Sequence, residues 1–204
     1  MIRRHLQLFA GVCLCGFAVA GMVRANLGLG PWDVLHQGLA HRAGVSLGTA
    51  VIATSVLVMA LWLPLRQRPG VGTVVNIVMV GLMADVGLRL LPVSHDLVTR
   101  LSLLAFGIIG TGIGAAIYLG AHLGPGARDG LMTGIVRRSG WPVYGVRTCL
   151  ELSALSLGWL SGGTVGIGTV AFAFLTGPVI HVALPWCDHR KWRRQAPDGA
   201  CAGS

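Results

Sequence analysis

Long apolar runs, separated by short polar or glycine-rich stretches, dominate the pattern of hydrophobic and polar positions along this chain. A helix needs about 20 predominantly apolar residues to cross the hydrocarbon core of a bilayer. The pattern therefore predicts an all-α integral membrane protein with six transmembrane helices. The predicted spans are residues 5–24, 47–65, 70–91, 101–120, 143–161 and 165–186.

Two shorter, two-faced helices are predicted after the first and the fourth span, at residues 33–43 and 129–139. About ten residues rise only about 15 Å along a helix, which is too little to cross a bilayer. These helices therefore either lie in the membrane interface or enter the membrane as re-entrant half-helices.

The chain repeats itself with a shift of 96 positions and no gap. Of the 12 glycines in residues 1–96, 9 fall on another glycine after the shift, where chance would give about two. Each repeat holds three predicted spans, an odd number, so the second repeat enters the membrane from the opposite side. Such inverted-topology repeats of three occur in several secondary transporter folds. The expected organisation is one repeat in 1–96, a second in 97–187, and a disordered basic tail in 188–204.

Composition supports a membrane protein, since 53% of the residues are hydrophobic, 11% are charged and the mean hydropathy is +0.71. A water-soluble domain has about a quarter of its residues charged. Arg3 and Arg4 before an apolar run imitate a signal peptide. Residues 6–24 nevertheless match the internal residues 102–120, so we expect the first span to be retained.

The net charge of +9 is distributed as the positive-inside rule expects, which argues against a nucleic-acid partner. With both termini cytoplasmic, 11 basic residues lie inside and 4 outside. The inside set is Arg3, Arg4, Arg66, Arg68, Arg128, Arg137, Arg138, Arg190, Lys191, Arg193 and Arg194, and the outside set is Arg24, Arg42, Arg89 and Arg100. The basic tail is expected to anchor the topology at anionic lipids.

A glycine-rich stretch follows the first span of each repeat, and the two stretches are the candidate substrate-binding segments. Glycine and proline at this density break a helix and leave backbone groups free, which membranes tolerate only in protein or beside a watery cavity. The candidate residues are Gly28, Gly30, Pro31, Trp32, Asp33, Gly124, Gly126, Arg128 and Asp129. Asp33 and Asp129 occupy expected N-cap positions. The plainer alternative is two interfacial helices, each with an aspartate cap.

Ionisable residues inside spans are candidates for proton or ion coupling. Asp85 falls on His181 after the shift, so the two could pair across the repeat interface and carry a proton, or Asp85 could make a static polar contact between helices. A proton-coupling role predicts that Asp85→Asn abolishes transport without unfolding the protein. Arg147 and Glu151 are four residues apart on one helical face, so they can neutralise each other within the membrane.

No enzyme signature is visible, because the chain has no nucleophile elbow, HExxH or Walker motif. The five cysteines show no CxxC or metal-ligand spacing, and His36, His41, His122 and Asp33 lack a diagnostic spacing. We therefore expect neither a metal nor a cofactor. Small residues around Gly110-Thr111-Gly112-Ile113-Gly114 could pack helices within one chain or in a homo-oligomer.

Three motifs resemble the bacterial YczE/YitT-type integral membrane proteins, YczE branch. They are Gly28-Leu29-Gly30-Pro31-Trp32-Asp33-Val34-Leu35, Gly70-Val71-Gly72-Thr73-Val74-Val75-Asn76 and Gly166-Ile167-Gly168-Thr169-Val170. The resemblance extends to about Ala183 and implies a multi-pass protein of the bacterial plasma membrane. Some relatives have been grouped with drug exporters, which implies an export function.

The leading functional expectation is a secondary transporter or exporter of a small molecule. The alternative is a non-catalytic membrane accessory protein that supports a biosynthetic or secretion complex. A transporter would bind or move a solute when purified alone, whereas an accessory protein would be inactive without its partners.

Overall fold

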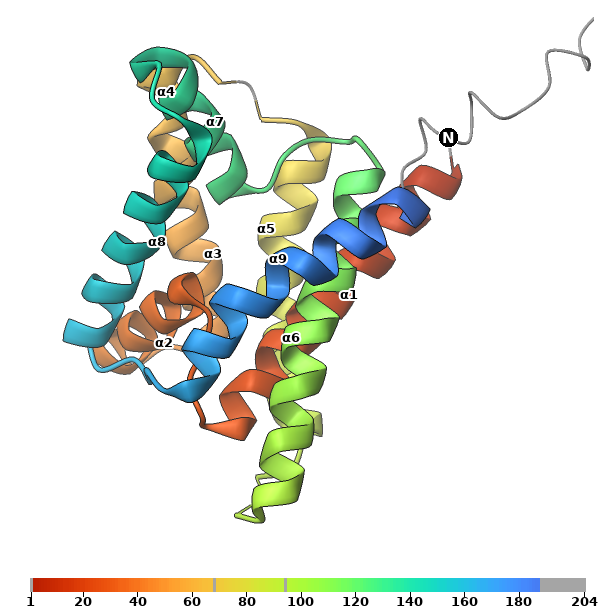
Figure 1. The fold of residues 1–204 in the computed structure, drawn as a ribbon, viewed down its shortest axis with the longest axis vertical. Helices are drawn as coiled ribbons and strands as arrows, with labels where there is room; N and C mark the ends of the chain where they lie inside the picture. The colour runs from red at the N-terminus through yellow and green to blue at the C-terminus, as the bar shows by residue number, and fades with distance from the viewer. Residues whose placement is uncertain (1, 68, 94, 188–204) are drawn as a thin grey trace, which may run out of the picture.

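A computed structural model describes residues 2–67, 69–93 and 95–187, and in this part of the chain all regular elements are helices (Figure 1). The predicted tail, 188–204, lies outside these residues. The helices are α1 (Ile2–Ala25), α2 (Pro31–Ala43), α3 (Leu47–Ala60), α4 (Trp62–Leu65), α5 (Val71–Leu90), α6 (Leu97–Gly120), α7 (Ala127–Ser139), α8 (Val143–Leu160) and α9 (Ile167–Cys187).

Five helical segments are long and apolar enough to span a membrane. They are Arg3–Ala25, Leu47–Leu65, Val71–Leu90, Leu97–Gly120 and Ile167–Cys187. The sixth predicted span is present as the 18-residue helix α8, but it is not one of the five. Its charged pair, Arg147 and Glu151, makes α8 less apolar than the others.

The helices form two groups. The first group holds α1, α5, α6 and α9, with α1 and α6 packed along each other (Figure 1). Small residues allow this close approach: a Cβ on Gly11 would lie 2.8 Å from the carbonyl oxygen of Gly114, and one on Gly114 would lie 2.7 Å from that of Gly11. The glycine stripe of α6 therefore packs a helix of the same chain.

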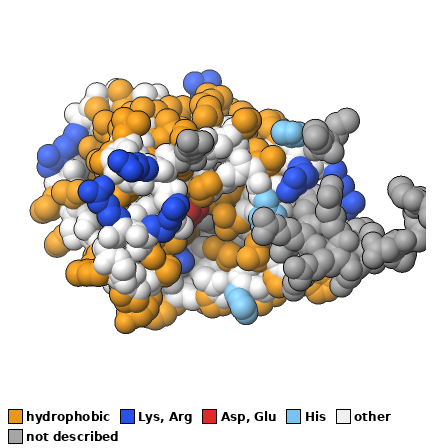
Figure 2. Space-filling view, turned by 90° about the horizontal axis from the view of Figure 1, so that it is seen from above, with side chains coloured by type: hydrophobic (Ala, Val, Ile, Leu, Met, Phe, Trp, Pro, Cys, Tyr) orange, Lys and Arg blue, Asp and Glu red, His pale blue; other side chains and the backbone are white. Residues whose placement is uncertain are grey.

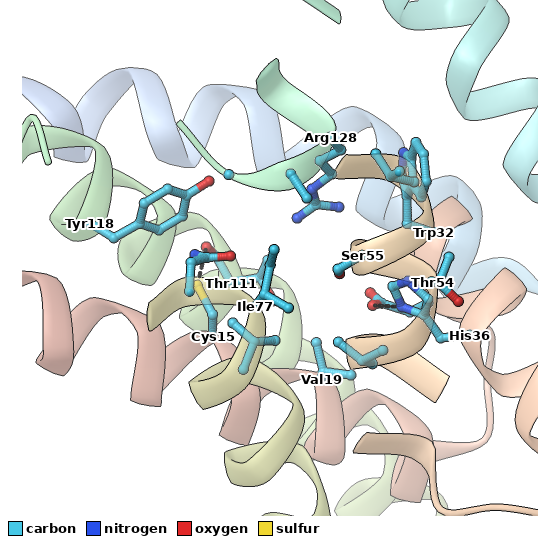
Figure 3. Close-up of a pocket in the computed structure, with 17 residues that line it drawn as sticks. Cys15, Val19, Trp32, His36, Thr54, Ser55, Ile77, Thr111, Tyr118 and Arg128 are labelled. Carbon is cyan, nitrogen blue, oxygen red and sulfur yellow. Dashed lines mark hydrogen bonds and ion pairs between the residues drawn. The ribbon is translucent and has the colours of Figure 1, made fainter. Parts of the chain in front are cut away.

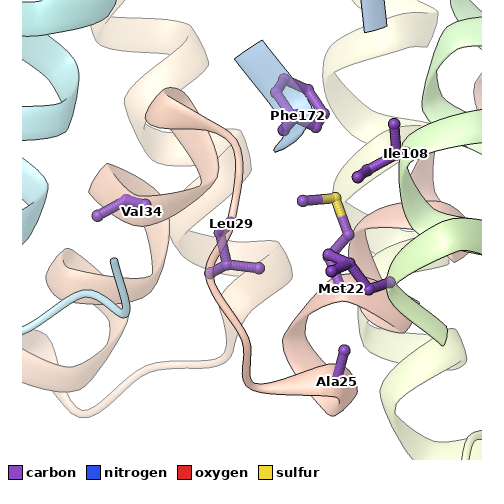
Figure 4. Packing of buried hydrophobic residues seen from close by; sticks show 7 residues of the cluster. Met22, Ala25, Leu29, Val34, Ile108 and Phe172 are labelled. Carbon is purple, nitrogen blue, oxygen red and sulfur yellow. The ribbon is translucent and has the colours of Figure 1, made fainter. Parts of the chain in front are cut away.

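The second group holds the short helices α2 and α7 with α3, α4 and α8. An apolar cluster joins the two groups at the linker between α1 and α2 (Figure 4). In this cluster Leu29 lies between Val34 on one side and Met22, Ile108 and Phe172 on the other. Helices in lipid gain stability from van der Waals contact rather than from the hydrophobic effect, so close fit matters more here than buried area.

The outer surface of the molecule is apolar. Large hydrophobic side chains are exposed on every predicted span, including Leu57, Val78, Ile109, Leu157 and Phe174. On a soluble protein such extended apolar exposure would favour aggregation, whereas in a bilayer it is the surface that lipid covers.

The two ends of the described chain lie on the same face of the molecule (Figure 1). There the Gln7 amide donates a hydrogen bond to the carbonyl oxygen of Cys187, at 2.7 Å. Figure 2 shows this face, with arginine side chains around a central hollow in which acidic atoms are visible. We call it the terminal face. At the opposite end of α6, Asp96 accepts a hydrogen bond from the Thr99 backbone N–H, which lowers the pKa of that carboxyl.

Candidate substrate-binding cavity

Each glycine-rich loop is hydrogen-bonded to a Gly-x-Gly-Thr motif of the other repeat, and these motifs are residues 70–73 and 166–169. The Gly168 N–H donates to the Leu27 carbonyl oxygen at 2.8 Å, and the Gly72 N–H donates to that of Leu123 at 3.1 Å. The 96-residue period therefore recurs in the backbone contacts.

The same period recurs in the backbone dihedrals. Residues with a left-handed φ form four pairs that are 96 positions apart: Asn26 and His122, Gly28 and Gly124, Gly44 and Gly140, and Arg66 and Gly162. Gly28 (φ 117°) and Gly124 (φ 138°) occupy conformations that strongly favour glycine. Both were candidate binding residues, but the structure places them against Thr169 and Thr73 and not in a cavity wall.

The short helices begin earlier than the sequence analysis predicted. α2 begins at Pro31 with Gly30 as its N-cap, and α7 begins at Ala127 with Gly126 as its N-cap. The prediction that Asp33 and Asp129 are N-caps was wrong, because both lie at the third helical position. Proline is well suited to the first helical position since it needs no N–H partner there, and glycine then takes the cap. Neither cap has a side-chain hydrogen bond.

Two adjoining cavities lie between the helix groups, of about 70 and about 330 Å³. Both are lined by Trp32, Thr111, Tyr118 and Arg128. Trp32 and Arg128 are repeat partners, since 32 + 96 = 128. The smaller cavity adds residues of α3 and α5, including Thr54, Ser55 and Asn76. The larger adds residues of α8 and α9, including Arg147, Glu151, Phe172, Thr176 and Ile180.

The cavities bring six of the nine candidate binding residues together. Pro31, Trp32, Asp33, Gly126, Arg128 and Asp129 line one or both. Gly30 lies directly behind them, and a Cβ there would approach Phe172 at 2.9 Å and the Asp33 carboxylate at 3.1 Å. The side chain of Arg128, which is exposed, lies in the cavity region beside Trp32 (Figure 3).

Most charged side chains of the cavities have a partner. Asp33 lies 3.6 Å from His36 Nδ1, and the Tyr118 hydroxyl donates to Asp129 Oδ2 at 2.9 Å. The predicted pair of Arg147 and Glu151 is present, with 2.9 Å between Nε and Oε1. Arg128 has neither a hydrogen bond nor an ion pair with any residue that the structure describes.

Three buried polar atoms that sequence reasoning missed also line the cavities. His36 Nδ1, Thr111 Oγ1 and Thr176 Oγ1 have no hydrogen-bond partner in the described chain. These residues are 8%, 4% and 6% exposed. Buried polar groups are nearly always satisfied, so the two threonine hydroxyls are available to a water or a bound solute, whereas His36 Nδ1 faces Asp33 Oδ1 at 3.6 Å.

The two repeats differ in one contact between the helix groups. α3 packs against α5, but α8 makes no comparable contact with α9 within the described residues. A Cβ on Gly81 of α5 would lie 2.7 Å from the Gly48 carbonyl oxygen of α3. A Cβ on its repeat partner, Gly177 of α9, would meet no described atom of another helix within 4 Å.

Asp85 reinforces the α3–α5 contact. Its carboxylate accepts hydrogen bonds from the Ser46 hydroxyl at 2.6 Å and from the Gly48 N–H at 2.7 Å. The structure therefore places Asp85 in a polar contact between helices at the start of α3. It does not bring Asp85 to His181, which is exposed on α9, and no ion pair joins the two residues in the described part.

Comparison with known proteins finds one family model, Family of unknown function (DUF6198), which matches residues 2–185. An uncharacterized protein of Haemophilus influenzae is 40% identical over 179 residues, 88% of this chain and 82% of its own. The uncharacterized membrane protein YczE of Bacillus subtilis is 32% identical over 187 residues, 91% of this chain and 87% of its own. The uncharacterized protein YyaS of the same organism is 25% identical over 186 residues. No solved structure matches the chain.

Proposed function

This chain belongs to the family of unknown function DUF6198 and is a YczE-type membrane protein, and we propose that it is an alternating-access transporter of a small solute. The transporter consists of two inverted repeats of three spans, α1, α3 and α5 in the first and α6, α8 and α9 in the second. The solute site lies where α2 and α7 begin.

A membrane position for α8 completes the six spans. Its exposed side chains include large apolar ones, with Leu152, Leu157 and Trp159 more than half exposed, beside the polar Arg147, Ser153 and Ser156. Its two charges form an ion pair, which lowers the cost of placing them in the bilayer. With six spans, the two termini lie on one side, in agreement with the hydrogen bond from Gln7 to Cys187.

Re-entrant positions for α2 and α7 agree with the burial of most of α2 and of Ala127, Gly130, Leu131 and Gly134 in α7. Asp33, Val34, His36 and Gln37 of α2 are all buried, which an interfacial helix with an aspartate cap would not require. Broken helices at matching positions of two inverted repeats mark the solute site of several secondary transporters.

The observation that carries the proposal is the unequal closure of the two repeats around one site. On the side of Gly48, Gly81 and Asp85, α3 and α5 are in contact and the adjoining cavity is the smaller one. On the side of Gly177, α8 and α9 are apart and the cavity is the larger one. Exchanging these two arrangements by rocking one helix group against the other would open the site to the opposite face.

The terminal face is cytoplasmic in this proposal, because the predicted basic residues at the ends of α4 and α7 lie on it. α9 ends at this face, and the larger cavity is lined by the middle of α9, at Phe172, Thr176 and Ile180. The described state is therefore open to the cytoplasm and closed outside.

Sided labelling tests the proposal without knowledge of the solute. In a background with all five cysteines replaced, Met132→Cys places a thiol in the wall of the larger cavity. An impermeant methanethiosulfonate reagent is then applied to right-side-out and to inside-out vesicles. An alternating-access protein reacts from both faces, faster from the terminal face.

A wedge variant provides the matched comparison. Gly177→Leu fills the space that α8 must enter to close the terminal face, so Met132→Cys should then react from that face alone. Ala173→Leu, at an exposed position of the same helix, serves as the control and should retain labelling from both faces. Labelling from one face in every variant would refute alternating access and favour the accessory role.

The inverted topology has its own labelling test. Ala43→Cys and Ser139→Cys occupy equivalent exposed positions at the ends of α2 and α7 (43 + 96 = 139). Labelling from opposite faces is expected, and labelling from the same face would rule out inverted repeats.

A further inference from the structure

Arg128 is the charged side chain of the cavities that has no hydrogen bond or ion pair among the described residues. An arginine retains its charge under all physiological conditions and offers five N–H donors. A cation within a membrane is costly, so such residues face a partner or a substrate path. Arg147 has a partner in Glu151, and Asp33 and Asp129 face His36 and Tyr118. The carboxylates of Asp33 and Asp129 interact electrostatically with Arg128, but the N–H donors of its guanidinium have no acceptor among the described residues.

The positive ends of two helices lie at the same place. α2 and α7 have 13 residues each, and their first turns line the cavities. Their N-caps, Gly30 and Gly126, provide no side-chain oxygen to the free N–H groups. Free N–H groups at a helix start and the helix dipole favour a negative group.

Two buried hydroxyl groups indicate independently that a ligand binds here. Thr111 and Thr176 are 4% and 6% exposed, line the larger cavity, and have no partner for Oγ1 in the described chain. A buried hydroxyl without a partner costs stability, and a bound acceptor would remove that cost.

The rest of the cavity wall is apolar and aromatic. Trp32 lies beside Arg128 at the equivalent repeat position (Figure 3), and Phe172 and Ile180 extend the apolar wall on α9. A volume of about 330 Å³ lies at the lower end of the range for small-molecule sites.

We propose that this cavity binds an organic anion. Its negative group lies at Arg128 between the first turns of α2 and α7, where it accepts hydrogen bonds from the guanidinium, and its apolar body lies against Trp32 and Phe172. The identity of the anion as transported solute rests on the proposed function, but its binding does not.

Calorimetric titration of the purified full-length chain in a neutral detergent tests this proposal. The probes are octanoate and octylamine, which share a chain length and differ in the sign of charge. Octanoate should bind and octylamine should not. Arg128→Gln should weaken octanoate binding roughly tenfold to a hundredfold, because it removes a charge-assisted contact, and Arg128→Lys should weaken it less.

Arg137→Gln is the matched control, since it removes the same charge from an exposed position of the same helix. It should leave octanoate binding unchanged. Equal weakening by Arg128→Gln and Arg137→Gln, or binding of octylamine alone, would overturn the proposal. Thermal unfolding and circular dichroism of each variant establish that it is folded.

An anionic lipid headgroup could bind to the same groups, and a second experiment distinguishes a lipid from a free organic anion. In nanodiscs of phosphatidylcholine or phosphatidylglycerol, a site for a free anion binds octanoate equally. Loss of octanoate binding in phosphatidylglycerol would assign the site to lipid and refute a free organic anion. Failure of octanoate binding with two-sided labelling of Met132→Cys would refute the anion alone and leave alternating access standing.

Discussion

Gly81 and Gly177 are repeat partners in opposite environments, so alanine at each position measures the unequal closure directly. At Gly81 the new Cβ would lie 2.7 Å from the Gly48 carbonyl oxygen and 2.7 Å from Ile52 Cγ1. Carbon atoms in contact prefer about 3.5–4.0 Å, and a backbone carbonyl cannot move unless α3 moves with it. Overpacking of this kind costs about 1–3 kcal/mol, against about 0.5–1 kcal/mol gained by replacing a helical glycine.

A Cβ at Gly177 would meet no described atom of another helix within 4 Å, so the clash is absent. Gly177 precedes Pro178, and a side chain before proline is disfavoured in a helix, which offsets the propensity gain. Gly177→Ala should therefore be nearly neutral, and Gly81→Ala should lower the free energy of unfolding by about 1–2 kcal/mol. The difference corresponds to roughly 2–8 °C in Tm for a chain of this size.

Tryptophan fluorescence during heating, with the protein in detergent, measures the two Tm values against the unsubstituted chain. Circular dichroism establishes that both variants retain their helices. Equal destabilisation by the two substitutions would mean that α9 is packed at Gly177 as α5 is at Gly81. The described asymmetry would then not exist in solution, and the alternating-access proposal would lose its main support.

Three further substitutions test single contacts. Thr73→Val should lower the free energy of unfolding by about 1–3 kcal/mol in a melting experiment, because the fully buried hydroxyl donates to the Pro125 carbonyl oxygen at 2.7 Å. Thr169→Val loses only an acceptor for the Gly166 N–H and should therefore lower it less. A larger loss for Thr169→Val than for Thr73→Val would contradict this assignment. Glu151→Gln should reduce the yield of membrane-inserted protein, because it leaves Arg147 unpaired. Adding Arg147→Gln should restore that yield. No recovery in the double variant would show that insertion of α8 does not depend on this ion pair. Tyr118→Phe should destabilise the start of α7 because Asp129 loses its hydroxyl donor, and an unchanged Tm would show that water replaces it.

Sequence periodicity predicted the helices well because spans follow from length and apolarity alone. The sequence also indicated correctly that the helices break near Gly30-Pro31-Trp32 and Gly124-Pro125-Gly126, since glycine and proline affect the backbone at their own positions. Local rules misplaced the first turns of α2 and α7 by two residues, because an aspartate in a first turn resembles an N-cap. The proline of the first motif marked the helix start at Pro31 and could have corrected this error.

The composition of the cavity could not be obtained from local pattern. Thr111 lies within a glycine stripe and Tyr118 near the end of a span, and nothing near either residue in sequence indicates that they meet Arg128. Arg128 was assigned to the cytoplasmic surface because charge counting treats each basic residue between spans as a topology signal. Charge counting gives no information on whether such a side chain also lines a cavity, as Arg128 does.

In the alternating-access proposal the repeat makes two arrangements geometrically equivalent, and residues that diverge between the repeats decide which one is occupied. Asp85 gives the α3–α5 contact a charged acceptor for the start of α3, where a helix dipole favours negative charge. The residue equivalent to Asp85 in the second repeat is His181, which would face the start of α8 if α8 and α9 came into contact. An imidazole is a weaker hydrogen-bond acceptor than a carboxylate at a helix start. His181→Asp should therefore stabilise the alternative arrangement and increase labelling of Met132→Cys from the face opposite the terminal face. Asp85→Asn should shift labelling in the same direction by weakening the existing contact. Decreased labelling from that face in both variants would mean that neither residue biases the equilibrium in this way.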